Sequence, residues 1–269
     1  MTNATSMNAQ WLQLKLAIVF LTRLPLRIEQ AVDDEMLNRA TGYVPFVGAL
    51  VAIVAGLVLW SSSLLLPIEV AVILSIVASI LLTGAFHEDG LADTADGFGG
   101  GWTQAQKLNI MKDSRIGTYG ATALLLTLLL KYELLVSIAS ISISIAVTAL
   151  VFAHVMSRAF AVSLIASMAY VQLERESKTK PVAESLSSES IRTIVITLAI
   201  VALIAFSLLP VSLFSFAILF LVLAVVRVGF CSLVRAQIAG YTGDVLGAAQ
   251  QVFELTTYVT LFALIGGMY

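Results

Sequence analysis

The feature that most constrains this chain is a series of long stretches that are almost free of charged residues. A helix of about 20 mostly apolar residues crosses a bilayer, and only helices or closed barrels satisfy their backbone hydrogen bonds there. The seven predicted spans are Gly42–Leu66, Val70–Phe86, Gly117–Leu130, Leu134–Met156, Thr193–Leu209, Val211–Val226 and Val252–Gly267. The sequence therefore predicts an all-α fold, a polytopic integral membrane helical bundle with about seven transmembrane helices.

Composition also favours a surface that faces lipid rather than water. Hydrophobic residues make up 59% of the 269 positions and charged residues only 12%, whereas a soluble domain is roughly 45–50% apolar and about 25% charged. The formal net charge of −2 provides no general attraction for polyanions. A soluble enzyme, a nucleic-acid-binding protein and a disordered scaffold are therefore poor candidates. No repeat or long linker divides residues 1–269, which predicts a single integral membrane domain.

Two further apolar segments are predicted to lie in the membrane plane as interfacial helices. Trp11–Leu24 is short for a span, and Arg158–Gln172 has arginines on both flanks. Whether Trp11–Leu24 crosses the membrane stays open. The boundary between the third and fourth spans rests on Lys131-Tyr132-Glu133, and the alternative is one longer, tilted helix that runs through Lys131.

The distribution of basic residues predicts the orientation. With Glu29–Thr41 on the cytoplasmic side, the segments richest in Lys and Arg also lie inside, and only Lys131 falls near the outer side. We therefore expect the N-terminus and the large loops of this protein on the cytoplasmic side of the membrane. Its acidic and glycine-rich region, residues 87–120, would form an active-site region that faces the cytoplasm.

The few charged residues are concentrated directly after the second predicted span. Eight of them fall between His87 and Arg115. On a helix, Asp89, Asp93 and Asp96 share an arc of roughly 60° and Glu88 points away from it. Three carboxylates on one face repel one another unless a cation lies between them, and Mg²⁺ prefers such hard oxygen ligands. The spacing predicts that the three aspartates are metal ligands and catalytic residues; the alternative is a solvated acidic loop.

The residues that follow suit phosphate groups. Glycines let backbone N–H groups approach a phosphate, and Lys and Arg donate to its oxygens. Asp113 is expected to join the metal ligands or to orient the neighbouring arginine. The alternative is that the basic residues only mark the end of the next helix. The candidate phosphate- or substrate-binding residues are Gly99, Gly100, Lys112, Ser114 and Arg115.

Three residues elsewhere are additional candidates for substrate binding. His154 lies one helical turn before Arg158, so both side chains would face the same cavity; the alternative for His154 is a packing role. Asp244 follows two glycines and a threonine within an otherwise apolar region. It would either complete the metal or substrate site or cap a helix that begins near Val245.

The longest motifs resemble the cobalamin synthase family, whose members are adenosylcobinamide-GDP ribazoletransferases. HEDGLADTADGFGGG at 87–101 and MKDSRIGTYG at 111–120 carry the resemblance. FLTRLPL at 20–26, the VPFVGAL segment, SR at 157–158 and GYTGDVLGA at 240–248 follow the family's order, so the similarity covers nearly the whole chain.

This resemblance implies a magnesium-dependent transferase of cobalamin biosynthesis in the bacterial cytoplasmic (inner) membrane. A ribose hydroxyl of α-ribazole, or of its 5′-phosphate, would attack the phosphorus on the cobinamide arm of adenosylcobinamide-GDP, and GMP would leave. The product would be adenosylcobalamin or its 5′-phosphate. Whether the chain forms a homo-oligomer or associates with other cobalamin-assembly enzymes stays open.

Two other functions were weighed against this one. The acidic motif is also similar to that of membrane CDP-alcohol phosphotransferases of lipid synthesis, but their Ala-Arg pair is missing, because Asp93 follows Leu91-Ala92. A transporter would place its acidic residues near mid-bilayer, often in duplicated halves. Here the acidic residues follow a predicted span, and no duplication is apparent.

Overall fold

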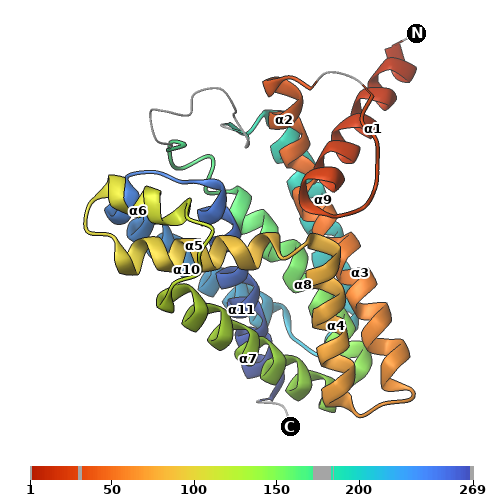
Figure 1. The fold of residues 1–269 in the computed structure, drawn as a ribbon. Helices are drawn as coiled ribbons and strands as arrows, with labels where there is room; N and C mark the ends of the chain where they lie inside the picture. The colour runs from red at the N-terminus through yellow and green to blue at the C-terminus, as the bar shows by residue number, and fades with distance from the viewer. Residues whose placement is uncertain (1, 30–31, 172–182, 184, 267–269) are drawn as a thin grey trace.

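The computed structural model is helical throughout the part of the chain that it describes, apart from turns and one isolated bridge. It describes residues 2–29, 32–171, 183 and 185–266, and the side chains of residues 2–8 are not described. The bridge joins Tyr170 to Tyr241. The elements (Figure 1) are α1 Thr2–Leu21, α2 Asp34–Ala40, the 3₁₀ helix η1 Thr41–Tyr43, α3 Val44–Ser63, α4 Ile68–Thr83, α5 Phe86–Gly100, α6 Gln104–Met111, α7 Thr118–Ile141, α8 Ile143–Val162, α9 Ser188–Leu208, α10 Leu213–Ile238 and α11 Gly243–Gly266.

Several of these helices are long and apolar enough to cross a membrane, which confirms the predicted fold class. Five described segments qualify, namely Asp34–Ser63, α7, α8, α9 and α10, and the count rises to six if the bent pair of α4 and α5 is one broken span. The apolar part of α1, Ala9–Leu21, is shorter than the others. At 1.5 Å per residue it reaches only about 20 Å, less than the roughly 30 Å of a hydrocarbon core.

The predicted break at Lys131 is wrong. Helix α7 runs through it to Ile141, and the chain breaks at Ser142 instead, where the backbone is extended. Lys131 is only 4% exposed, because its ammonium group is paired with Glu254 inside the bundle. A charge that is paired inside the protein does not have to end a helix.

The predicted interfacial helix Arg158–Gln172 is also wrong over the described residues. Helix α8 continues to Val162 with Arg158 buried in the bundle, and residues 163–171 form turns that end in the bridge at Tyr170. Residue 172 lies outside the described part of the chain, as does residue 267 at the end of the last predicted span.

A sharp bend between α4 and α5 sets the acidic helix across the bundle. The two helices differ in direction by 86°, and the two residues between them, Gly84 and Ala85, have φ values of 66° and 59°. Left-handed backbone suits glycine at a helix C-terminus. The predicted span Val70–Phe86 therefore ends early, at Thr83, and Phe86 begins α5. In Figure 1, α5 crosses the view nearly at right angles to α4.

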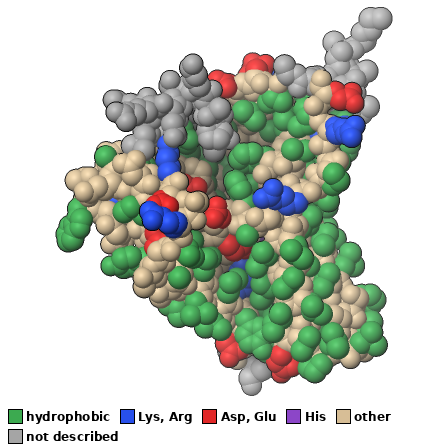
Figure 2. All heavy atoms as spheres, viewed as in Figure 1, with side chains coloured by type: hydrophobic (Ala, Val, Ile, Leu, Met, Phe, Trp, Pro, Cys, Tyr) green, Lys and Arg blue, Asp and Glu red, His purple; other side chains and the backbone are tan. Residues whose placement is uncertain are grey.

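The outer surface of the long helices is apolar. Leu81 on α4, Leu203 on α9 and Leu221 on α10 are 64–70% exposed, and hydrophobic side chains cover most of the lower body in Figure 2. In that view the charged side chains lie mainly in the upper half and in the middle, around α5 and α6. Exposed apolar surface on this scale is expected where lipid is the solvent.

Helix α11, which contains most of the predicted span Val252–Gly267, is an internal helix. It is not among the helices apolar enough to span by composition, since Gln250, Gln251 and Glu254 interrupt it. All three side chains are 1–2% exposed, and α11 packs mainly on α5 and α8. Gln250, Gln251 and Glu254 thus find polar partners inside the bundle rather than in lipid or water.

Candidate active site

The aspartates of the acidic motif lie on a helix, as their spacing predicts. Helix α5 carries Asp89, Asp93 and Asp96 within its 15 residues. Asp89 is exposed, Asp93 is half-buried and Asp96 is buried. Glu88 is turned away from them, into the bundle, where its Oε1 accepts a hydrogen bond of 3.0 Å from Gln251.

A close crossing of α5 and α11 brings a fourth carboxylate to this face. A Cβ atom built on Gly90 would lie 2.7 Å from the carbonyl oxygen of Asp244 and 3.2 Å from the Cα of Gly247. Only glycine lets the two backbones approach so closely. The crossing fixes Asp244, in the first turn of α11, beside the aspartates of α5.

The electrostatics show how crowded these carboxylates are. Burial and the negative charges of Asp89, Asp244 and Asp96 raise the pKa of Asp93 to about 7. Burial and the charge of Asp89 likewise raise the pKa of Asp244 to about 6, although Lys112 opposes this rise. A bound cation would relieve this repulsion between the ionised carboxylates.

Asp244 does not act as the cap of its helix. Helix α11 begins at Gly243, and the N–H of Val245 donates to the hydroxyl of Thr242 at 3.2 Å. The capping alternative for Asp244 is therefore wrong. Its carboxylate forms a hydrogen bond with the Thr242 side chain and lies within range of the charges of Asp89 and Lys112.

Asp96 has a structural task that the sequence did not reveal. Its Oδ2 accepts the N–H of Gly117 at 2.7 Å and its Oδ1 accepts the N–H of Gly120 at 2.8 Å. These donors belong to the free N–H groups at the start of α7, where a carboxylate also interacts favourably with the helix dipole. Asp96 therefore ties the end of α5 to the beginning of α7, whereas among the described residues no such bond is made by Asp89 or Asp93.

The donor set suits a magnesium ion that substrate helps to bind. Within the described ranges, no three Asp, Glu, His or Cys side chains converge closely enough to hold an ion by themselves. Mg²⁺ commonly takes only one or two carboxylates, together with waters and substrate phosphates. Asp89, Asp93 and Asp244 offer carboxylates for that kind of site, since the charge of Asp89 raises the pKa of both Asp93 and Asp244.

Helix α6 positions the basic half of the motif. It begins with a capping box between Thr103 and Gln106, and the buried ammonium group of Lys107 donates to Gln237 on α10. It ends at Lys112, whose positive charge acts on Asp244. The structure thus brings Lys112 near Asp244, the carboxylate that α11 contributes.

Asp113 and Arg115 form a local, exposed pair. Arg115 Nη2 lies 2.6 Å from Asp113 Oδ2, and the arginine side chain is 86% exposed. The hydrogen bonds from Arg115 lower the pKa of Asp113 to about 2. Asp113 therefore orients Arg115, which is one of its two predicted roles. Ser114, between them, is exposed.

The glycine loop expected to cradle a phosphate does not form. Gly99 and Gly100 belong to the last turn of α5, and Gly101 continues the pattern by donating to the carbonyl oxygen of Gly97 at 3.0 Å. The space beside Gly99 is filled by the ring of Tyr119, 2.5 Å from where a Cβ would lie. The glycines serve the packing of α5 against α6 and α7.

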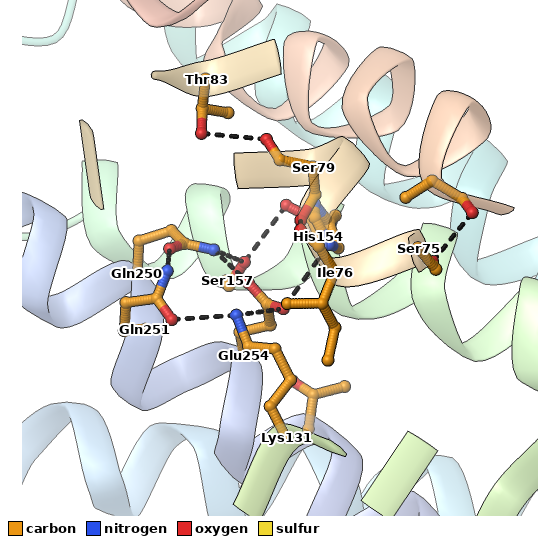
Figure 3. A network of polar contacts seen from close by, with 12 residues as sticks. Ser75, Ile76, Ser79, Thr83, Lys131, His154, Ser157, Gln250, Gln251 and Glu254 are labelled. Carbon is orange, nitrogen blue, oxygen red and sulfur yellow. Dashed lines mark hydrogen bonds and ion pairs between the residues drawn. The ribbon is translucent and has the colours of Figure 1, made fainter. Parts of the chain in front are cut away.

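His154 and Arg158 lie inside the bundle, on α8, rather than beside the aspartates of α5. Arg158 Nη1 is 3.2 Å from His154 Nδ1 and donates to the His154 carbonyl oxygen at 3.1 Å. His154 Nε2 is 3.5 Å from Oε1 of Glu254. The two side chains therefore share one environment, a buried polar network (Figure 3), and their role in substrate binding stays a prediction.

Sequence reasoning missed the other members of this network. Lys131 on α7 is paired with Glu254 at 3.1 Å and donates to Gln251 at 3.0 Å. Gln250 donates to Glu254 at 2.6 Å and to Ser157 at 3.1 Å. The available signal was the presence of one Lys and one Glu within apolar stretches, since such charges face a partner inside the bundle. In Figure 3 the side chains of α7, α8 and α11 converge there.

This chain is similar to known proteins along nearly its whole length. The family model described as cobalamin-5-phosphate synthase matches residues 13–262. An adenosylcobinamide-GDP ribazoletransferase of Shewanella frigidimarina (strain NCIMB 400) is 46% identical over 248 residues, which cover 92% of this chain and 93% of that protein. The enzyme of the same name from Shewanella amazonensis is 43% identical over 249 residues, covering 93% and 94%. No solved structure is detectably similar to this chain.

Proposed function

Because the chain belongs to the cobalamin-5-phosphate synthase family and is an integral membrane protein, we propose that it joins adenosylcobinamide-GDP to α-ribazole with release of GMP. The observation that carries the proposal is the 43–46% identity, over more than nine-tenths of both chains, to proteins named adenosylcobinamide-GDP ribazoletransferase. The comparisons give no support to a CDP-alcohol phosphotransferase or a transporter.

The reaction replaces an anhydride bond at phosphorus with an ester bond. A ribose hydroxyl oxygen of α-ribazole bonds to the phosphorus on the cobinamide arm, the bond from that phosphorus to the bridging oxygen breaks, and GMP leaves with that oxygen. The hydroxyl proton passes to a base, and Asp89 or Asp93 suits this role because no hydrogen bond of either carboxylate is found within the described residues. The same reaction on α-ribazole 5′-phosphate would give the 5′-phosphate of the product.

The remaining tasks are to hold the metal ion and to bind the phosphate groups of the substrate. Asp89, Asp93 and Asp244 would hold Mg²⁺, which when bound offsets negative charge on the diphosphate and on departing GMP. Lys112, beside Asp244, would donate to a phosphate oxygen. Arg115, exposed and oriented by Asp113, would bind the GDP portion of the substrate.

The proposed setting is the cytoplasmic side of a bacterial inner membrane. The orientation rests on the cytoplasmic bias of Lys and Arg. In Figure 2 charged side chains gather on the upper part of the protein, around α5 and α6. A site there would be open to water-soluble nucleotides, while the apolar faces of α9 and α10 contact lipid.

The test uses purified full-length protein in liposomes with adenosylcobinamide-GDP. GMP release that requires both α-ribazole and Mg²⁺ is expected. Release that proceeds equally without α-ribazole, or joining of the corrinoid to a lipid alcohol instead, would overturn the proposal.

A further inference from the structure

A mostly apolar cavity, partly open to the outside, lies beside the candidate active site. It has a volume of about 90 Å³, several times the roughly 10–15 Å³ that one water needs by the same measure. It lies between α1, α3, α8, α11 and the first turn of α5. Its apolar lining includes Leu16, Phe20, Val44, Ala161 and Leu246.

Two polar side chains line this cavity, and one of them, Arg158, lacks part of its hydrogen bonding. Arg158 lines it and is 2% exposed, and its Nε–H is buried without a partner in the described structure. Gly48 allows this placement, since a Cβ there would lie 2.7 Å from Arg158 Cδ. The ring of His87 also lines the cavity, and its described contact is with the ring of Phe86. A buried donor left unpaired costs about 1–3 kcal/mol, so it favours a ligand that brings an acceptor.

The cavity adjoins the carboxylates across the glycine crossing. Phe86 and Gly247 line it, and each lies three residues from a proposed metal ligand, Asp89 on α5 and Asp244 on α11. Residues three apart on a helix are neighbours on its surface. A ligand seated in the cavity would therefore extend toward Asp89 and Asp244.

We propose that this cavity binds the aromatic base of α-ribazole, an inference that rests on the proposed function. That base is a dimethylbenzimidazole, a flat bicycle with two methyl groups and one free ring nitrogen. Its apolar edge matches Leu16, Phe20 and Leu246, and its ring nitrogen accepts a hydrogen bond from Arg158. With the base held there, the ribose hydroxyls lie on the side of Asp89 and Asp244.

The other parts of the two substrates match this cavity less well. Guanine presents several donors and acceptors around its edge, and an apolar lining would leave them unpaired. The corrin ring with its amide side chains is far larger than a cavity of about 90 Å³. A lipid acyl chain would fit the apolar lining but would leave the Nε–H of Arg158 without an acceptor.

The test measures direct binding of α-ribazole to the purified protein in detergent. The change in benzimidazole fluorescence reports the binding. Ala161→Phe places a ring inside the cavity and should weaken binding at least tenfold. It should raise the KM for α-ribazole by a similar factor and change the KM for adenosylcobinamide-GDP less than twofold. Ala217→Phe, on an exposed position of α10, is the matched control and should bind as the unsubstituted protein does.

Two measurements keep the inference testable if Ala161→Phe does not fold. Phe20→Ala removes a half-exposed wall of the cavity and should also raise the KM for α-ribazole. Free dimethylbenzimidazole should compete with α-ribazole, whereas dodecanoate should not. An unchanged dissociation constant in a folded Ala161→Phe protein, or displacement by dodecanoate alone, overturns the inference. Absence of GMP release by the unsubstituted protein would instead overturn the proposed function, because the binding measurements do not depend on turnover.

Discussion

The crossing of α5 and α11 makes Gly90 the position where the smallest change should have the largest effect. A Cβ added there would lie 2.7 Å from the Asp244 carbonyl oxygen and 3.1 Å from its Cα, both backbone atoms. Ordinary contact begins near 3.4 Å, so the helices must separate by about 0.7 Å. Overpacking of this kind costs about 1–3 kcal/mol, and the better helix propensity of alanine returns about 0.5–1 kcal/mol.

The expected consequence of Gly90→Ala is loss of activity more than loss of fold. A displacement approaching 1 Å in a catalytic arrangement can lower the rate by about 10²-fold, because Asp244 moves away from Asp89 and Asp93. The assay is GMP release from adenosylcobinamide-GDP with saturating α-ribazole and Mg²⁺, together with thermal unfolding in detergent.

Gly100→Ala is the matched control on the same helix. A Cβ at Gly100 would meet only the Cδ1 of Ile110, at 3.4 Å, so its activity should be unchanged and its unfolding temperature equal or slightly higher. Full activity in Gly90→Ala, or equal damage in both variants, would refute the argument that the close crossing places Asp244.

Four further substitutions test other parts of the account. Asp93→Asn should lower Mg²⁺-dependent GMP release at least 10²-fold while the protein still inserts, and normal turnover would exclude Asp93 as a metal ligand. Asp96→Asn should chiefly weaken the cap of α7, by about 1 kcal/mol in thermal unfolding, and should retain more activity than Asp93→Asn. Arg115→Ala should raise the KM for adenosylcobinamide-GDP, and an unchanged KM counts against its role. Lys131→Met should destabilise the protein by about 3–5 kcal/mol by leaving Glu254 without its cation, and adding Glu254→Gln should recover part of that loss in chemical unfolding.

The sequence predicted well wherever a local pattern dictated the outcome. Charge-free stretches correspond to apolar helices, and the spacing of Asp89 and Asp93 placed both on one helix. The sequence predicted poorly wherever the structure depends on contacts between residues far apart in the chain. A charged residue in an apolar stretch predicts the end of a helix, and Lys131 was placed at such an end. Its partner Glu254 lies 123 positions later, so the pattern of neighbouring residues cannot show that the charge is paired inside the bundle.

The glycines illustrate the same limit within the site. Consecutive glycines are compatible with a phosphate-binding loop, but a helix whose glycines admit a neighbouring side chain has the same composition. The glycines form a helix here because Tyr119 and α6 pack against them. The spacing of residues 97–101 contains no information about that packing. Asp96 and Asp93 likewise have different roles, because α7 begins beside Asp96 and its first N–H groups bond to that carboxylate.

The central claim is that Asp89, Asp93 and Asp244 form a divalent cation site completed by the diphosphate of the substrate. Mn²⁺, used in place of Mg²⁺, reports on this directly, because bound and free ions differ in their electron paramagnetic resonance spectra. Mn²⁺ should bind the purified protein in the presence of adenosylcobinamide-GDP and should bind at least tenfold more weakly to Asp89→Asn and Asp244→Asn. Equal Mn²⁺ binding by the unsubstituted protein and both variants would contradict the account.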